Sequence, residues 1–346
     1  MQTQALQTPA LIIDLDRMER NIAQMQARCD AIGIKFRPHI KTHKNTQIAR
    51  AQLDAGAVGI ACQKVSEAHL FAGAGFNDIL IPYNIVGEAK TAALMELALY
   101  NRVTVSADSL EVVHGLSQAA AKDDTGLRVL VDLETTMRRT GATPHEVVKI
   151  AQAIEADAQL HFAGVMLYPS TRADRPLLLE ALAALDAVGL GVDVVSGGGI
   201  GAALEMADFP ELTEIRVGTY VFNDWTTLQR GWCAPDDIAL TIAATVISVH
   251  PERVILDCGS KTLSESTFDG VYGALVEYPE ARIYKLSEEH AFVDIRACEH
   301  PPRFGDRVHI IPAHVCVAVN LANGMFGVRG DAVESELWVE ARGRVW

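Results

Sequence analysis

Residues 127–167, with the sequence LRVLVDLETTMRRTGATPHEVVKIAQAIEADAQLHFAGVML, hold the pattern that decides the fold. The apolar runs at 127–132 and 160–167 predict buried strands, and the segment 144–156 between them carries apolar residues at helical spacing. A helix that links two strands of one sheet joins them in parallel, through a right-handed crossover. The stretch therefore predicts one β-α-β unit.

The same alternation repeats on both sides of this stretch. Six more runs predict strands, at 35–40, 57–62, 79–83, 103–107, 192–196 and 214–217. Further helical segments lie between most of them, at 87–101, 109–122 and 174–188. Eight such units within about 200 residues favour a closed (β/α)8 barrel of the TIM type over an open doubly wound sheet.

Outside this region the pattern changes. Asp16 and Glu19 stand at capping-box spacing and predict the start of a first helix that ends at Gly33. After about residue 229, short strand-like runs alternate with Gly, Pro and Asp turns. We therefore expect a barrel over 12–228 and an all-β domain over 229–346, which the opening run ALIID and the rest of 1–11 join.

Composition excludes several classes of protein. The 346 residues carry 30 Lys and Arg against 44 Asp and Glu, a net charge of −14, without a basic block. Such a chain repels nucleic acid. No run approaches the roughly 20 apolar residues of a membrane span, and the N-terminus lacks signal-peptide features. The six cysteines form no CxxC pair. We expect a cytoplasmic protein without nucleic-acid or membrane partners.

Lys41 follows the first predicted strand in PHIKTHK. Reactive groups of such barrels lie where strands end, and partial desolvation there lowers the pKa of a lysine and frees its amine for imine chemistry. The alternative is a solvated loop lysine, one of three in a basic turn.

Two glycine-containing stretches follow the last two predicted strands. The segment SGGGIG, Ser196 to Gly201, allows close approach of a ligand and directs backbone N–H groups at an anion, which predicts a phosphate site; a flexible turn is the alternative. Gly218 and Tyr220, with Thr219 between them, complete this site in the same prediction or else pack as plain strand.

Three weaker candidates remain. His314 and Cys316 alternate in a run expected to be a strand, so both side chains point to one face and offer two ligands for Zn²⁺ or a similar ion; plain core is the alternative. Arg139 and Arg138 are equally placed to meet an anionic oxygen. Tyr168 ends a strand, where it either stacks on a ring or closes the barrel rim.

Together these stretches resemble a known family. TPALIIDLDRMERNI, RPHIKTHK, SGGGIG, IRVGTYVFND and IPAHVC, spread over most of the chain, are similar to the fold-type III pyridoxal-phosphate enzymes, the alanine racemase superfamily. Within it, the chain resembles the D-threonine aldolase and D-serine dehydratase branch. RPHIKTHK combined with a C-terminal His-x-Cys is the most specific part of the resemblance.

The resemblance implies a role for each candidate. Lys41 carries pyridoxal 5′-phosphate covalently, and Arg139 approaches the hydroxyl of its ring. The ring is lined and the phosphate held by Gln63, Tyr168, Ser196, Gly198, Gly199, Gly218, Thr219 and Tyr220. His314 and Cys316 bind a divalent ion, Zn²⁺ or Mn²⁺. The family is also homodimeric, and the metal pair serves either its own or the partner's cofactor.

The resemblance further implies a lyase acting on β-hydroxy-D-amino acids, with retro-aldol cleavage to glycine and an aldehyde as the favoured reaction. Dehydration of D-serine or 3-hydroxy-D-aspartate is the alternative, followed by racemisation and a non-catalytic cofactor carrier. Relatives place a histidine after the tyrosine of the sixth strand, whereas this chain reads YPSTRADRP. His43 is therefore the reserve candidate for the general base.

Overall fold

Eight parallel strands form one sheet in the computed structural model, which describes all residues, 1–346. Their order in the sheet is β2-β9-β8-β7-β6-β5-β4-β3. The strands are β2 (Lys35–Phe36), β3 (Ile60–Ala61), β4 (Asp78–Asn84), β5 (Arg102–Ala107), β6 (Leu127–Leu133), β7 (Leu160–Leu167), β8 (Val194–Gly198) and β9 (Glu214–Arg216). All eight predicted strands are confirmed.

The sheet closes on itself just after β2. The His39 N–H donates to Val217 O at 2.9 Å, which continues the pairing of β2 with β9. On the other side, Ala61 N donates to Pro38 O at 2.8 Å, and His39 forms a parallel bridge with Ala61 in β3. The first and last strands of the sheet are thus joined, and the predicted (β/α)8 barrel is confirmed.

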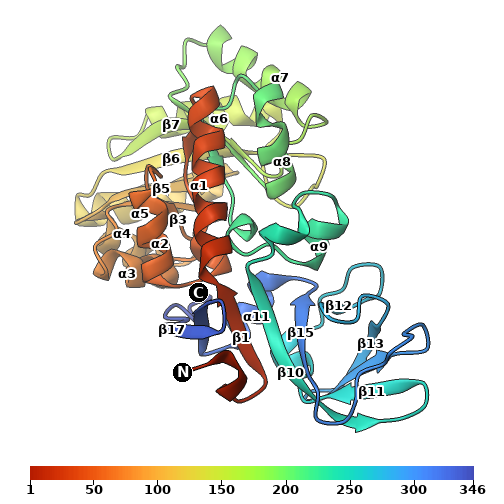
Figure 1. Cartoon of the computed structure of the whole chain (residues 1–346). Coiled ribbons are helices and arrows are strands. Elements are labelled where there is room, and N and C mark those ends of the chain that lie inside the picture. Colours follow the sequence, from red (N-terminus) through yellow and green to blue (C-terminus); the bar gives the residue numbers. More distant parts are fainter. The chain divides into compact units, whose positions relative to one another are not determined.

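Helices alternate with these strands (Figure 1). They are α1 (Leu15–Ile32), α2 (Thr46–Asp54), α3 (Val65–Gly73), α4 (Glu88–Ala98), α5 (Leu110–Asp123), α6 (Pro144–Glu155), α7 (Arg175–Ala187) and α8 (Ile200–Glu205). Helix α6 shows how the sequence sets them: Glu146 accepts from the N–H and hydroxyl of Thr143, Pro144 occupies the first turn, and Val147, Ile150 and Ile154 are buried.

The start of α1 differs from the prediction. Asp14, not Asp16, receives the N–H of Arg17, at 3.0 Å, and so caps the helix. Asp16 and Glu19 instead both form ion pairs with Arg329. The capping-box spacing therefore reflects an ion-pair site on the exposed face. No helix of the chain combines the length and apolar character needed to cross a membrane.

The chain divides into two compact units. The barrel unit comprises Gln26–Lys41, Ala49–Gly218 and Arg344–Trp346. The β unit comprises Met1–Met25, Thr42–Ile48 and Thr219–Gly343.

A nine-stranded sheet builds the β unit. Its strands are β1 (Ala10–Asp14), β10 (Leu240–Val249), β11 (Arg253–Leu256), β12 (Gly273–Leu275), β13 (Arg282–Leu286), β14 (Ala291–Asp294), β15 (Arg307–Pro312), β16 (Gly324–Arg329) and β17 (Ala332–Trp338). Three short helices accompany them: α9 (Trp225–Gln229), α10 (Ser260–Leu263) and α11 (Val315–Leu321).

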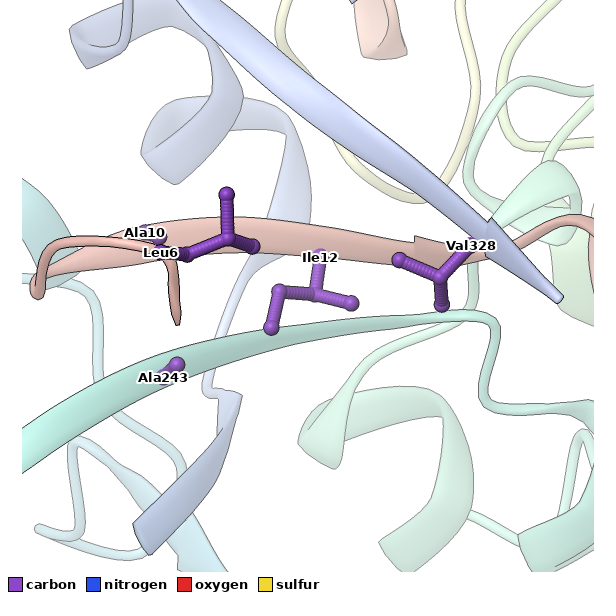
Figure 2. Packing of buried hydrophobic residues seen from close by; sticks show 5 residues of the cluster. All are labelled: Leu6, Ala10, Ile12, Ala243 and Val328. Carbon is purple, nitrogen blue, oxygen red and sulfur yellow. The ribbon is translucent and has the colours of Figure 1, made fainter. Parts of the chain in front are cut away.

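The N-terminal run ALIID forms β1 inside this sheet, as expected. It pairs antiparallel with β10 and parallel with β16. Figure 2 shows the resulting small core, in which Ile12 lies among Leu6, Ala10, Ala243 and Val328. Segments more than 200 residues apart in the chain are thereby held together by apolar burial.

Candidate active site

Lys41 and Gln63 converge at the ends of β2 and β3. Lys41 lies in a short 3-10 helix, Ile40–Thr42, and its Nζ is 3.5 Å from Gln63 Oε1. The same oxygen accepts a hydrogen bond from His39 Nε2 at 3.0 Å. The Gln63 N–H in turn donates to Glu67 Oε2 at 2.6 Å. The Gln63 side chain is thus held through its oxygen by His39, and its backbone N–H is held by Glu67, so Oε1 faces the lysine amine.

The glycine triplet lies at the end of β8, and two of its N–H groups are already engaged. Gly198 N donates to Ser170 Oγ and Gly199 N donates to Arg216 O, both at 3.1 Å. These two N–H groups are therefore not directed at an anion, and the phosphate site as a whole stays a prediction. The next two N–H groups, of Ile200 and Gly201, belong to the first turn of α8, where the helix itself offers no acceptor.

Glycine is nevertheless required at this position, because Tyr168 packs against the loop. A Cβ on Gly198 would lie 3.0 Å from the Tyr168 ring and 3.2 Å from the Arg216 guanidinium. Gly199 has φ of 111°, a conformation that other residues rarely adopt. The triplet therefore acts by letting an aromatic ring approach the backbone.

Arg139 lies over the same ring. Its guanidinium carbon is 4.8 Å from the centroid of Tyr168, a cation–π contact. Arg138 and Arg139 are both exposed, but Arg138 has φ of 52°, and the ring contact is made by Arg139. The structure thus separates the two arginines that the sequence left equivalent: Arg139 joins the loops after β6, β7 and β8 into one cluster with Tyr168 and the glycine triplet.

Asp174 holds two of these loops together. Its Oδ1 accepts from the N–H and hydroxyl of Thr136, both at 2.8 Å, and its Oδ2 accepts from the N–H and hydroxyl of Thr171. Burial alone would raise its pKa, but these hydrogen bonds keep the pKa of the carboxyl below its ordinary value. Asp174 is fully buried, and Thr135 adds a bond to Tyr168 O at 2.9 Å.

The hydrogen bonds of Asp174 to Thr136 and Thr171, called the loop brace below, have only a partial signal in the sequence. Thr171 and Asp174 stand three residues apart just before α7, a spacing typical of a helix cap. That signal was available in YPSTRADRP. Ser170 of the same segment is the acceptor for Gly198 N, so YPSTRADRP connects the loops after β6, β7 and β8.

A buried polar chain runs beneath the triplet. Arg37 donates to Glu214 at 2.8 Å and to Asp78 at 2.7 Å, and Ser196 Oγ donates to the other oxygen of Glu214 at 2.7 Å. Arg216 NH1 donates to Ser196 Oγ and to Ser196 O, at 2.5 and 2.8 Å. The hydroxyl of Ser196 is therefore engaged and buried, and its role as a direct cofactor ligand stays a prediction.

Two buried groups beneath the glycine triplet, Arg216 and Asp132, have pKa values far from their ordinary ones. Burial lowers the pKa of Arg216 to about 10, against the attraction of Glu214 and Asp132. Burial raises the pKa of Asp132 to about 6, although Thr140 donates to it at 2.9 Å. Asp132 lies near the end of β6, and the charge of Arg139 lowers its pKa by less than burial raises it.

The β unit holds the remaining predicted residues. Thr219 and Tyr220 belong to a 3-10 helix, Thr219–Val221, and Tyr220 is buried. Gly218 ends the preceding segment of the barrel unit. Their joint action at one phosphate stays a prediction.

His314 and Cys316 lie at the start of a helix, not in a strand. His314 is the N-cap of α11 and Cys316 is in its first turn, so the strand argument for their common face is wrong. They are nevertheless in contact: hydrogen bonds to Asp224 and to Cys316 raise the pKa of His314 to about 10. His314 Nδ1 is 3.1 Å from Asp224 Oδ2.

The surroundings of the pair contain hydroxyl groups. Cys316 Sγ lies 3.2 Å from Thr42 Oγ1 and 3.7 Å from Thr219 Oγ1. The structure holds no set of three or more His, Cys, Asp or Glu side chains placed to bind one metal ion.

His43 is fully buried, and its Nδ1 accepts the N–H of Asn45 at 3.1 Å. A neutral ring with Nδ1 as acceptor carries its proton on Nε2 and therefore donates there. As it lies, His43 is not set up as a general base, which weighs against its reserve role.

Comparisons with known proteins agree with this architecture. A model of the alanine racemase N-terminal domain matches residues 13–224, and a model of a serine dehydratase domain matches 239–328. D-threonine aldolase from Arthrobacter sp is 34% identical over 97% of this chain and 93% of its own length. D-threo-3-hydroxyaspartate dehydratase from Delftia sp. (strain HT23) is 31% identical over 90% of this chain and 91% of its own length.

The crystal structure of D-threonine aldolase from Filomicrobium marinum superimposes with a TM-score of 0.91, at 30% identity, covering 99% of this chain and 97% of that one. These relatives carry names of aldolases and a dehydratase, so the prediction of a lyase is confirmed at that level. The chain belongs to the alanine racemase N-terminal domain family.

Proposed function

We propose that the chain is a pyridoxal 5′-phosphate-dependent and divalent-metal-dependent lyase that cleaves β-hydroxy-D-amino acids to glycine and an aldehyde. One observation carries the proposal: the ends of the barrel strands bring a lysine amine, a fixed amide, an aromatic ring and a guanidinium to one rim. Lys41 and Gln63 meet there at 3.5 Å, and Arg139 lies 4.8 Å from the ring of Tyr168.

The residues of the rim fit the cofactor. Its aldehyde needs a primary amine, its ring a flat neighbour, its phenolic oxygen a cation and its phosphate N–H donors. Lys41, Tyr168, Arg139 and the first turn of α8 supply these groups, and Gly198, without a Cβ, lets the Tyr168 ring lie against the loop. The bound cofactor supplies an electron sink conjugated to Cα of the amino acid.

The protein's own residues then orient and hold protons. Gln63 Oε1, fixed by His39, accepts from Lys41 Nζ and so directs the amine. Tyr168 holds Arg139 in one position by the cation–π contact. Asp174 fixes the loop after β6 against the loop after β7. Ser196 holds the guanidinium of Arg216 beneath the glycine triplet.

His314 and Cys316 fit a divalent ion. Asp224 accepts from Nδ1 of His314, and the Cys316 sulfur lies in contact with the ring, so Nε2 and Sγ offer a mixed nitrogen and sulfur donor pair. Such a pair suits Zn²⁺, and two protein ligands leave coordination positions open, as a catalytic site requires. A bound ion supplies a Lewis acid for the β-hydroxyl group of the substrate.

Dehydration is the second candidate, because a relative of comparable similarity is named D-threo-3-hydroxyaspartate dehydratase. The same groups serve both reactions, which differ only in the substrate bond that breaks. Loss of the Cα–Cβ bond gives glycine and an aldehyde, whereas loss of the β-hydroxyl gives a keto acid and ammonia.

Purified protein with cofactor and Zn²⁺ or Mn²⁺ tests the two candidates on D-threonine and D-serine separately. Glycine with acetaldehyde from D-threonine supports the aldolase. 2-Oxobutyrate from D-threonine or pyruvate from D-serine supports the dehydratase. Turnover confined to L-threonine and L-serine, run as matched enantiomers, overturns the proposal.

A further inference from the structure

Asp224 connects the starts of two helices in the β unit. It is the N-cap of α9, where its Oδ1 accepts the N–H of Thr227 at 2.9 Å. Its Oδ2 accepts from His314 Nδ1 and from the N–H of Val315, both at 3.1 Å. The side chain is fully buried. Oδ1 thus caps α9, and Oδ2 binds the start of α11, which carries the proposed metal ligands.

The position of Oδ2 decides which nitrogen of His314 is available. A carboxylate only accepts, so the nitrogen facing it carries hydrogen, and Nε2 keeps its lone pair in the neutral ring. The second bond, from Val315 N, holds the carboxylate in place, so a rotation of the imidazole ring would break its bond to Asp224. Asp224 therefore fixes both the tautomer and the direction of the imidazole.

Cys316 has a comparable neighbour. Thr42 is fully buried, and its hydroxyl lies 3.2 Å from Sγ, with that of Thr219 further away at 3.7 Å. A hydroxyl that donates to sulfur stabilises the thiolate, the form that binds metal. Replacing Thr42 by valine preserves its shape and removes only this hydroxyl.

We infer that Asp224 and Thr42 are positioning residues of the metal centre: Asp224 presents Nε2 of His314, and Thr42 stabilises the thiolate of Cys316. The inference rests on the proposed function, which assigns the metal to His314 and Cys316. It adds two residues that act through these ligands and contact no reacting atom. A carboxylate behind a metal-binding histidine typically changes metal affinity by about 10- to 100-fold.

Asp224→Ser keeps the cap of α9 and removes the two bonds to the start of α11. Serine is a good N-cap and still reaches Thr227 N, but it is too short to reach His314. We expect Zn²⁺ affinity, measured by competition with a chelator, to fall about 10- to 100-fold while the melting temperature stays within a few degrees. Asp237→Ser is the matched control, because Asp237 caps a neighbouring 3-10 turn through Ala234 N and does not contact His314.

Thr42 is tested with Co²⁺, whose thiolate charge-transfer band reports the sulfur ligand directly. Thr42→Val should shift or weaken this band and reduce affinity several-fold, and Thr42→Ser, which keeps the hydroxyl, should restore both. A structural role alone would lower the melting temperature of the valine variant without moving the band.

The outcomes separate the inference from the proposed function. If wild-type protein binds Zn²⁺, His314→Ala and Cys316→Ala do not, and Asp224→Ser and Thr42→Val bind as wild type does, only the inference is overturned. If wild type and His314→Ala bind Zn²⁺ equally, the metal assignment itself is wrong. Should Asp224→Ser fail to fold, Asp224→Asn decides, because its amide cannot accept at both helices; unchanged affinity in it also overturns the inference.

Discussion

The barrel unit and the β unit both carry proposed reactive residues, but the two units position them by different means. In the barrel unit, Lys41, Gln63 and Tyr168 follow strands whose parallel direction brings their ends to one rim. In the β unit, His314 and Cys316 lie at the start of a helix whose direction depends on a hydrogen bond to Asp224, 90 residues away in the chain.

The difference shows where each arrangement is vulnerable. Strand pairing distributes the cost of a substitution over many backbone hydrogen bonds, so the position of a rim residue survives local changes. A helix cap concentrates the arrangement in one buried carboxylate. We therefore expect the two units to lose their ligands independently of each other. Outside the hydrogen bonds of Asp174, the barrel rim should tolerate single substitutions better than the start of α11 does.

The largest expected effect separates the two units. Lys41→Ala should abolish the visible absorption band of the cofactor and reduce activity by roughly 10³-fold or more, while Zn²⁺ affinity stays unchanged. Cys316→Ala should do the reverse: it should lose Zn²⁺ binding and keep the band. Lys35→Ala, at an exposed lysine in β2, is the control. A band that persists in Lys41→Ala would exclude this lysine as the attachment point.

A smaller effect is expected at the loop brace. Asp174→Ala leaves four donors of Thr136 and Thr171 without their acceptor, so we expect about 2–4 kcal/mol of lost stability and roughly tenfold weaker cofactor binding. Asp157→Ala is the matched control: Asp157 accepts from Ser117, Gln159 and Leu160 at the opposite end of β7. It should cost stability alone. Equal cofactor affinity in both variants, by absorption titration, would refute the brace.

The comparison also explains how far the sequence could predict the molecule. Strand runs and helix periods are local signals, and in the barrel they identified all eight strands and the loops that carry Lys41, Arg139 and Tyr168. The closing pair, His39 with Ala61, adds only one bridge, but the count of eight units already implied it. The glycine triplet was correctly located, whereas the use of its N–H groups depended on Ser170 and Arg216, which no local pattern indicates.

In the β unit the local signal was misleading. Val315, Val317 and Val319 favour a strand by intrinsic preference. The structure forms a helix there because Asp224 accepts the first N–H, of Val315, and a helix can begin. Tertiary context thus overrides the preference of three β-branched residues. Periodicity cannot reveal a partner 90 positions away, so neither Asp224 nor Thr42 was predictable.

The smallest effect concerns the pH dependence of the barrel rim. Burial raises the pKa of Asp132 to about 6, above the ordinary value near 3.8. Between these values the folded protein holds a proton that the unfolded chain has released, so this group makes the free energy of unfolding fall as pH rises from about 4 to about 6. Asp132→Asn removes that dependence and should retain the acceptor for Thr140.

Chemical denaturation at several pH values measures this difference. The stability of Asp132→Asn relative to wild type should increase by up to roughly 3 kcal/mol between pH 4 and pH 6 and then level off. Asp157→Asn should show the opposite sign, because hydrogen bonds outweigh burial and hold the pKa of Asp157 below its ordinary value. Its carboxylate therefore contributes stability that is lost as pH falls below about 4. A flat difference for Asp132→Asn across this range would mean that the carboxyl at the end of β6 ionises like a solvated one, and that the barrel rim is wetter than the buried side chains around Arg216 indicate.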